Sequence, residues 1–586
     1  MRLNRLKLIG QYKSIVGTEE HPFIYTFKPN SEGYSPICLV GLNGSGKSNF
    51  IELIADIFGY ADRYFNPQYE CSEDLTYDFE IEYQITGGSV LRTVLLKCTS
   101  SNLKMLYLEG ERPFSYGVNG LEDNQVDDML ELLQGFNEVT SGCHEMLPTN
   151  VIAYSSGNNQ GLSSVFAKAQ LSFYNVVRKQ GVFHREYAKR FEKLITRHDD
   201  FDENQVNELR EYIKKSHERN ESLFEPPLDY GGEIDIDVPL SSIKAYRPIG
   251  TFTDHAANQL FFISLMVNES AKFERFLNDY ANIETLESFE IDLRLSEYRD
   301  LDFIKDEAIR LQQLSCDSSK FNEDTLNGVL KFEVNQGFFE KIESLYLERS
   351  MFLDNLMFIS QMVAKRWSID EKRTLKTSCY ERNVPNIAGG LAPIRFINTR
   401  VRLINPNTVT LYDRLSDGEH QLIQIIGSLI LFGSQQSLFI LDEPESHFNP
   451  EWRIEFVDII NNYVDLSKLE LIISTHSPFV LSACKSKRVL HFQKDPDGCV
   501  AIQSLGNVET YGASFDSLLA SVFDLDVLIS KKPLSELRAG LQAYDEGGIG
   551  EPETLKWLES YGDSFEVNFR RNQIKHKIAS NDRGED

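Results

Sequence analysis

A glycine-rich loop near the start of the chain has the residue types and the spacing that hold a polyphosphate. Residues 41–48 fit the pattern G-x-x-x-x-G-K-[ST], and the apolar run before them, residues 36–40, is typical of a buried strand. Glycines let backbone N–H groups turn toward phosphate oxygens, lysine in this pattern reaches the β- and γ-phosphates, and the final hydroxyl binds Mg²⁺. We therefore expect ATP and Mg²⁺ as ligands, held by Gly41, Asn43, Gly44, Ser45, Gly46, Lys47, Ser48 and Asn49.

Two neighbouring acids far downstream have the spacing of a hydrolytic site. Asp442 and Glu443 follow the apolar residues 438–441, which predict another buried strand. An acid at the end of such a strand can hold the Mg²⁺ shell, and the acid after it can orient or deprotonate an attacking water. Asp442 is therefore a predicted metal ligand and Glu443 the predicted catalytic base; the alternative is simple surface charge.

A polar segment before these acids permits two interpretations. Ser416 and Glu419 have the S-x-x-E spacing of a capping box that opens the apolar helix 422–431. The same helix start presents free N–H groups and the positive end of the helix dipole, which attract phosphate. Gly418 has no side chain and allows a close approach. Both interpretations can hold together, so Ser416, Gly418 and Glu419 are candidate nucleotide contacts.

Five motifs follow one another in one order, at residues 41–48, 415–419, 438–443, 446–450 and 474–478. The set resembles ABC-class ATPases of the OLD, RecF and SMC type, including AAA_21-type proteins. In that family the segment matching 415–419 contacts the γ-phosphate of ATP held by a second protomer, and the loop matching 444–450 crosses the dimer interface. The resemblance makes His476 the sensor of the γ-phosphate, where a lone histidine is otherwise more often structural. It implies a homodimer, or a higher even oligomer, closed by an ATP sandwich.

Two further candidates depend on the same resemblance. Residues 9–15 are similar to an N-terminal segment of RecF- and SMC-like ATPases in which a basic residue lies near the nucleotide, which indicates Lys13. Gln160 follows the strand-like run 151–154 and a loop with Gly157, and it is a Q-loop candidate that would contact both the nucleotide and the metal. The alternatives are a solvated charge at a strand end and an ordinary polar loop residue.

The spacing of the motifs indicates how the chain is organised. About 370 residues separate Lys47 from Ser416, so a long insertion splits the ATPase head. We expect an α/β fold, an ABC-type split ATPase head with a P-loop core and an antiparallel β subdomain, a long and mostly helical insertion, and a C-terminal accessory tail. The predicted parts are an N-lobe, an insertion, a C-lobe and a partner-docking tail, at residues 1–155, 156–394, 395–500 and 501–586.

Periodicity predicts the elements within these parts. Alternating runs at 77–83, 91–97 and 104–108 predict an antiparallel meander with a turn at Gly87 and Gly88. Helices are predicted in the insertion, and no apolar heptad continues over three or four repeats, so we expect a compact arm rather than a long coiled coil. The clearest of these predicted helices are 185–194, 203–221, 259–280 and 339–366.

Composition restricts the classes of function. The 586 residues carry a formal net charge of −28, which excludes a generally basic nucleic-acid-binding protein and leaves room for a local basic groove. The eight cysteines are scattered without a C-x-x-C pair, as expected for reduced thiols in the cytoplasm. No apolar run of about 18 residues occurs and the N-terminus is strand-like, so we predict neither a membrane span nor a signal peptide.

The resemblance extends to the ATPases of Septu antiphage systems and of retrons that carry a Septu module. It rests on residues 474–478 and on the tail segment that begins at Tyr511. In those systems the ATPase controls a separate HNH nuclease, and the retron form adds a reverse transcriptase with its DNA and RNA. The resemblance implies a defence component that hydrolyses ATP while a partner cleaves nucleic acid. The basic cluster 570–577 is either a solvated face or a docking site for a partner or for nucleic acid.

Four other functions compete with this interpretation. One is a RecF- or Rad50-like ATPase that repairs or senses DNA. Another is an OLD-type nuclease with a Toprim domain; Asp524 and Asp526 spell D-x-D, but they follow a helix-like stretch, 514–523, and no β/α unit with a matching glutamate precedes them. The long split between motifs disfavours a transporter ATPase. The presence of both Asp442 and Glu443 disfavours a scaffold that never hydrolyses ATP.

Overall fold

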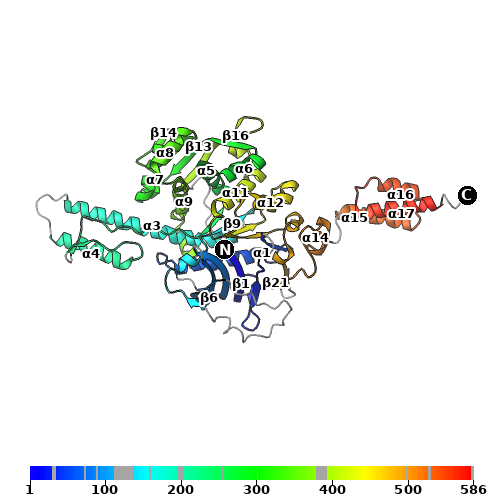
Figure 1. Cartoon of the computed structure of the whole chain (residues 1–586), viewed down its shortest axis with the longest axis horizontal. Helices are drawn as coiled ribbons and strands as arrows, with labels where there is room; N and C mark the ends of the chain where they lie inside the picture. The colour runs from blue at the N-terminus through cyan, green and yellow to red at the C-terminus, as the bar shows by residue number, and fades with distance from the viewer. Residues whose placement is uncertain are drawn as a thin grey trace. The chain divides into compact units, whose positions relative to one another are not determined.

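The computed structural model describes residues 1–29, 34–71, 74–87, 90–110, 136–157, 160–195, 203–230, 233–253, 255–299, 301–377, 392–495, 498–525 and 530–581. The chain divides into two units, Met1–Gly512 and Ala513–Asp586. Figure 1 shows the elements of both units.

A seven-stranded sheet carries most of the predicted motifs. In order across the sheet, its strands are β12 (Gly250–Thr253), β9 (Asn150–Ser155), β18 (Ser437–Asp442), β19 (Leu469–Ser474), β4 (Ile37–Gly41), β20 (Val489–Lys494) and β21 (Val500–Gln503). Neighbours pair in parallel except β20 with β21. In an open parallel sheet, sites form at the carboxyl ends of the strands. Gly41, Asp442 and Ser474 lie together at that edge.

Alternate residues of the central strands enter two separate cores. In β18, Leu438 and Ile440 join the core that contains much of α1 (Lys47–Phe65). Phe439 and Leu441 join the core that contains α11 (Asp417–Phe432) and α12 (Pro450–Tyr463). Both faces of the sheet are therefore buried, which is why its strands are continuous apolar runs in the sequence. The edge that carries the motifs is held from both sides.

The predicted meander is part of a second, antiparallel sheet. Its order is β2-β1-β5-β6-β7-β8, with β3 also paired to β1. The alternating runs of the sequence form β5, β6 and β7, and Gly88 of the expected turn lies outside the described residues. The bounds are β1 (Arg2–Tyr12), β2 (Ile15–Gly17), β3 (Phe23–Thr26), β5 (Tyr77–Gly87), β6 (Val90–Thr99), β7 (Asn102–Glu109) and β8 (Asn137–Glu138).

The insertion is rich in helices, as expected. It also supplies three strands of a five-stranded antiparallel sheet, in the order β14-β15-β13-β16-β17, whose last two strands belong to the predicted C-lobe. Figure 1 shows α3 (Gln160–Ile195) running away from the two sheets of the head, with α4 (Glu203–Arg219) beside it. The sheet strands are β13 (Ile283–Arg294), β14 (Asp317–Asn322), β15 (Asn327–Glu333), β16 (Ile394–Leu403) and β17 (Val409–Leu411). Since β12 pairs with β9 and β16 with β13, pairings run across the predicted boundaries near residues 155 and 394.

Two of the predicted helices are wrong in their extent. The stretch 259–280 is interrupted after α5 (His255–Val267), because Glu269 takes a left-handed conformation with φ of 49°. The stretch 339–366 is divided into α8 (Gln336–Leu345) and α9 (Ser350–Gln361), with the exposed Leu347 between them. Apolar periodicity extended over these breaks because both neighbours bury residues in the same core. The remaining helices here are α6 (Ala271–Phe276), α7 (Asp302–Leu314) and α10 (Ile369–Thr377).

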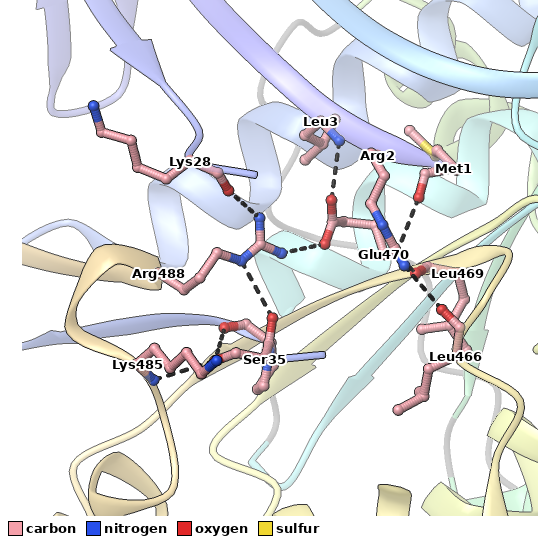
Figure 2. A network of polar contacts seen from close by, with 11 residues as sticks. Met1, Arg2, Leu3, Lys28, Ser35, Leu466, Leu469, Glu470, Lys485 and Arg488 are labelled. Carbon is pink, nitrogen blue, oxygen red and sulfur yellow. Dashed lines mark hydrogen bonds and ion pairs between the residues drawn. The ribbon is translucent and has the colours of Figure 1, made fainter. Parts of the chain in front are cut away.

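A buried polar network fastens the first strand of the antiparallel sheet to the central sheet (Figure 2). The Arg488 guanidinium pairs with the Glu470 carboxylate, and both side chains are almost completely buried. Glu470 also accepts a hydrogen bond of 3.0 Å from the backbone N–H of Leu3. Arg488 donates to the carbonyl oxygens of Ser35 at 3.2 Å and of Lys28 at 2.8 Å. Because every charge has partners, the network stabilises this junction rather than leaving an isolated charge in the core.

The C-terminal unit is a small helical unit with its own core. Its helices are α14 (Phe515–Ser521), α15 (Lys531–Asp545), α16 (Glu551–Leu558) and α17 (Phe565–Asn581). Leu537, Leu541, Leu558, Val567 and Ile574 form the core. Asp524 of the D-x-D follows α14, whereas Asp526 lies outside the described residues. In the part of the chain that the structure describes, no helix is long and apolar enough to cross a membrane.

Candidate nucleotide-binding site

The glycine-rich loop connects β4 to the start of α1, as its sequence predicts. Gly41, Gly44 and Gly46 have φ of 144°, 76° and 105°, conformations that L side chains rarely adopt. A Cβ at Gly46 would lie 2.3 Å from a methyl of Val500, and one at Gly41 would lie 2.3 Å from the carbonyl oxygen of Phe492. Glycine is therefore required at these two positions both by backbone conformation and by space.

The loop offers hydrogen-bond donors suited to phosphate. No side chain caps the start of α1, so its first N–H groups are available at the positive end of the helix dipole. The Ser45 hydroxyl is buried without a hydrogen-bond partner. The Lys47 ammonium donates to the carbonyl oxygens of Gly41 at 2.9 Å and of Leu42 at 3.3 Å. These groups fit a polyphosphate, because it would supply acceptors for the orphaned hydroxyl, the free N–H groups and the ammonium.

Burial affects the charge of Lys47. It lowers the pKa of the ammonium to about 8, although the carboxylates of Glu443 and Asp442 act in the opposite direction. The lysine therefore lies near the two acids that the sequence assigned to hydrolysis. A cation and two acids share the edge of the sheet, so binding of phosphate and activation of water can occur in one place.

The acids Asp442 and Glu443 occupy the carboxyl end of β18. Asp442 accepts a hydrogen bond from the Ser474 hydroxyl at the end of β19. Glu443 has a left-handed φ of 51°, which is unusual for a residue with a side chain, and its N–H donates to the Ser474 carbonyl at 3.0 Å. Such strain persists only where surrounding contacts hold it, and it is frequent at functional sites.

His476 lies beside the predicted base. Its Nε2 is 3.5 Å from Oε1 of Glu443. Burial, then the Lys47 charge, lowers the pKa of the imidazole, while Asp442 opposes this. Burial, then the Asp442 charge, raises the pKa of Glu443. The structure thus brings Asp442, Glu443 and His476 to Lys47, from which they are 395, 396 and 429 residues apart in the sequence.

Two of the three predicted Mg²⁺ ligands lie at the carboxyl edge of the central sheet. Ser48 is in the first turn of α1 and Asp442 ends β18, so both belong to the same edge of the sheet. Mg²⁺ in nucleotide sites commonly uses one or two protein ligands, with waters and phosphate oxygens as the others. In the described ranges, no group of three or more His, Cys, Asp or Glu is placed to hold a metal ion. Gln160 is the first residue of α3, and its side chain lies outside the described part.

Lys13 contacts α1, the helix that follows the glycine-rich loop, through its ion pair with Glu52. It has a φ of 51°, and its ammonium pairs with the buried carboxylate of Glu52 on α1. Glu52 is four residues after Ser48, on the same helix face. A Cβ at Gly161, the second residue of α3, would lie 2.3 Å from Oε1 of Glu52. Glu52, the partner of Lys13, therefore lies close to the start of α3.

The predicted capping box at α11 is present. The Ser416 hydroxyl accepts from the N–H of Glu419 at 3.3 Å, and the Glu419 carboxylate accepts from the N–H of Ser416 at 2.7 Å. A Cβ at Gly418 would lie 2.8 Å from the carbonyl oxygen of His447 in the same chain. The glycine thus already has a packing role within one chain, and its contact with a nucleotide across a dimer remains a prediction.

Sequence reasoning missed several residues that fix the site. Gln421 on α11 accepts from the N–H of His447 at 3.1 Å, and Asn449 caps α12 by accepting from the N–H of Trp452 at 2.7 Å. Glu445 accepts from the Thr475 hydroxyl. Asn449 followed by Pro450 is a helix-start signal that the sequence contained. The other two contacts join separate motifs, and no local pattern indicates them.

Comparison with known families gives matches to part of the chain. The family described as "AAA domain, putative AbiEii toxin, Type IV TA system" matches residues 390–482, which contain four of the five motifs. The Septu protein PtuA of Bacillus thuringiensis is 22% identical over 224 residues, 35% of this chain and 52% of that protein. Protein ea59 of Escherichia phage lambda is 28% identical over 114 residues, 20% of this chain and 21% of that protein. The chain thus spans about half and about a fifth of the length of these relatives.

One solved structure similar to the chain is the SMC head domain from Thermotoga maritima. It has 12% sequence identity and a TM-score of 0.30, over 86% of this chain and 99% of that domain. The family match at residues 390–482 and the similarity to PtuA support the predicted resemblance to an AAA/ABC-type ATPase related to PtuA. The central sheet, the antiparallel sheet and the many helices agree with the predicted α/β fold class. The predicted resemblance and fold class are confirmed.

Proposed function

We propose that this chain binds ATP with Mg²⁺, hydrolyses it, and acts as the ATPase of a bacterial antiphage defence complex that controls a separate HNH nuclease. The observation that carries the ATPase part is the meeting of Lys47, Asp442, Glu443 and His476 at the carboxyl edge of the central sheet. The defence part is supported by the relationship to PtuA, which covers about half of that protein.

Each residue in this edge has a chemical task in the proposal. Lys47, the Ser45 hydroxyl and the first N–H groups of α1 bind phosphate oxygens. Ser48 and Asp442 would hold Mg²⁺, which when bound neutralises charge on the phosphates. Glu443 orients a water and accepts its proton, and its raised pKa makes it a stronger base than an exposed carboxylate. His476 would sense the γ-phosphate, and its 3.5 Å contact with Glu443 would relay this to the base.

In the proposal, a dimer closed by bound ATP couples the nucleotide state to control of the partner. The capped start of α11 has an exposed Ser416, so a second copy could reach its dipole and its hydroxyl. Nucleotide held by Lys47 of one protomer would then meet Ser416 of the other, and loss of the γ-phosphate would remove the link. Such a switch acts by rigid-body change and suits an ATPase that controls a partner. In the retron form of the proposal, a reverse transcriptase with its DNA and RNA joins the complex.

The first experiment is purification of the tagged chain from its native operon, followed by ATP titration and hydrolysis assays. We expect an HNH nuclease to co-purify, and Mg²⁺-dependent ATP hydrolysis by the chain. Lys47→Met should weaken ATP binding about 10-fold to 100-fold, as expected for loss of charge-assisted hydrogen bonds. The matched control is Lys214→Met, on the exposed face of α4, which should bind ATP normally.

Other outcomes would change the proposal. Recovery of the chain without a nuclease, but with hydrolysis stimulated by DNA, would favour a repair or DNA-sensing ATPase. Nuclease activity of the isolated chain with a divalent metal would contradict the assignment of cleavage to a partner. Equal ATP binding by the Lys47 and Lys214 variants would contradict the assigned nucleotide site.

A further inference from the structure

Glu445 is a buried carboxyl that none of the roles above uses. It follows Glu443 by two residues, and only 5% of it is exposed. Its Oε1 accepts a hydrogen bond from the Thr475 hydroxyl, whereas its Oε2 is buried without a hydrogen-bond partner. An unsatisfied buried oxygen is unfavourable, so its presence beside a candidate active site requires an explanation.

Thr475 connects the two loops that carry the predicted base and sensor. It lies between Ser474, which donates to Asp442, and His476, which contacts Glu443. Its N–H donates to the carbonyl of Leu39 on β4 at 3.0 Å, and its hydroxyl accepts from the N–H of Ser477 at 2.9 Å. The bond from Thr475 to Glu445 therefore fixes the loop after β19 to the loop after β18.

Glu445 also begins the segment predicted to cross the dimer interface. Its carbonyl accepts from the N–H of Phe448 at 3.1 Å, which shapes the turn through residues 446–450. The N–H of His447 in that turn donates to Gln421 of α11 at 3.1 Å. The backbone of Glu445 thus forms part of the turn that contacts α11, while its side chain is bonded to the loop that carries His476.

A purely structural role explains Glu445 less well than it explains Glu470. Glu470 is buried too, but it is paired with Arg488 and accepts from Leu3. Burial raises the pKa of Glu445 to about 7; the Thr475 hydroxyl, the residue's own backbone N–H and the Arg453 charge oppose this, and the Glu443 charge adds to it. An apolar residue would remove the orphaned oxygen, and only an acceptor at Oε1 preserves the link to Thr475.

We propose that Glu445 is a positioning residue for ATP hydrolysis, which holds the Thr475–His476 segment in register with Glu443 through its bond to the Thr475 hydroxyl. This inference rests on the proposed function. In this proposal, Oε1 of Glu445 accepts the hydrogen bond that matters, and the carboxyl need not be ionised. Glutamine at position 445 keeps a carbonyl oxygen in that place, and serine at position 475 keeps the hydroxyl. Both substitutions should therefore preserve the function of the link.

The test compares disruptive with conservative variants in the full chain. Glu445→Ala and Thr475→Val should lower kcat by about tenfold to a hundredfold, because small misplacement of catalytic groups has effects of that size. KM and ATP binding should change less than about twofold, since the proposed link acts on the position of the hydrolytic groups and not on the groups that bind phosphate. Glu445→Gln and Thr475→Ser should keep most of the parent kcat. The double variant Glu445→Ala/Thr475→Val should be no slower than the slower single variant, because both remove one link.

A second measurement does not depend on hydrolysis. Hydrogen–deuterium exchange of peptides covering residues 474–482 should be faster in Glu445→Ala and Thr475→Val than in the parent, and unchanged in Glu445→Gln. Glu307→Ala is the control, because it removes a buried carboxyl that is bonded to Tyr346 and Asn355 in the insertion. It should leave exchange in 474–482 unchanged.

The two proposals fail in different ways. If the parent chain hydrolyses no ATP, the proposed function fails, and the exchange experiment alone decides whether Glu445 holds the His476 loop. If the parent hydrolyses ATP and Glu445→Ala has the parent kcat and exchange, the inference about Glu445 is wrong while the proposed function stands. Equal loss of kcat in Glu445→Ala and Glu445→Gln would also overturn it, since the carbonyl oxygen would then not be the working atom.

Discussion

Oε1 of Glu443 lies 3.5 Å from Nε2 of His476, although the two residues follow different strands of the central sheet. Burial lowers the pKa of the histidine and raises the pKa of the glutamate. The lowered pKa favours the neutral imidazole of His476, and the raised pKa makes the Glu443 carboxylate more basic than an exposed one. The contact places the imidazole beside the predicted base, where it can restrict the orientation of the carboxylate toward a water.

The first prediction concerns the pH dependence of hydrolysis. Glu443 acts as a base only when deprotonated, so activity should fall as pH drops through its raised pKa. The acid limb of kcat should therefore lie above 4.5, the ordinary pKa of a glutamate side chain. Glu443→Gln should remove this limb and leave a low rate with little pH dependence. A parent profile that stays flat down to pH 4.5 would contradict the assignment of Glu443 as the base.

The second prediction concerns assembly. Glu443→Gln should trap an ATP-bound dimer, since nucleotide is held but not cleaved, whereas Glu451→Gln on the exposed start of α12 should turn over normally. Adding Ser416→Asp should abolish this dimer, because aspartate keeps the N-cap of α11 and places a negative charge where phosphate is expected. Light scattering in the presence of ATP and Mg²⁺ measures the mass of each variant and so distinguishes monomer from dimer.

The control for that experiment is Ser416→Thr in the Glu443→Gln background, which retains both the cap and the hydroxyl. It should dimerise like the single variant. If Ser416→Asp dimerises equally well, the start of α11 does not contact nucleotide across an interface. If Glu443→Gln instead loses ATP binding, the separation of binding from hydrolysis at this edge is wrong.

The third prediction concerns stability. Burial raises the pKa of Glu445 and of Asp62 to about 7, from ordinary values of 4.5 and 3.8. Between those ordinary values and about 7, the folded chain binds more protons than the unfolded chain, so the free energy of unfolding falls as pH rises. This contribution is fully present below the unfolded pKa values and is lost as pH passes about 7. For Glu445 the total is about 3 kcal/mol.

Urea unfolding at about pH 5 and about pH 8 measures the effect. Glu445→Gln should reduce the difference in stability between the two pH values, and Asp62→Asn should reduce it further. Glu451→Gln, an exposed substitution, should leave the difference unchanged. An unchanged difference in Glu445→Gln would show that this carboxyl is not protonated in the folded chain.

The sequence predicted the parts of the site that depend on local patterns. The strands that end at Gly41 and Asp442 were visible as apolar runs, and the Ser416 cap as an S-x-x-E spacing, because such signals lie within a few residues. The antiparallel meander was predicted for the same reason. Order along the chain then indicated the fold, since the resembled family has the same motifs in the same order.

Contacts between distant segments could not be predicted in this way. The bond between Thr475 and Glu445 exists because β18 and β19 are neighbours in the sheet. The approach of Gly418 to His447 depends on the turn that follows β18. Strands β13, β14 and β15 were missed, although Phe289, Ile291 and Leu293 alternate in β13, since alternation among charged residues is a weak signal beside long helices.

The fourth prediction concerns the buried pair Arg488 and Glu470. Removing one partner leaves the other charge uncompensated in the core, so Arg488→Met should lower the free energy of unfolding by about 3–5 kcal/mol. Glu470→Met should have a similar effect, because Arg488 would keep only its carbonyl partners. The double variant should be less destabilised than the sum of the two, since no isolated charge remains. Denaturant unfolding measures all three, with Lys331→Met of the exposed pair Lys331–Glu333 as a control expected to change stability by less than about 1 kcal/mol. Additive losses would mean that the two charges stabilise the junction of β1 with the central sheet separately, through their backbone partners rather than through each other.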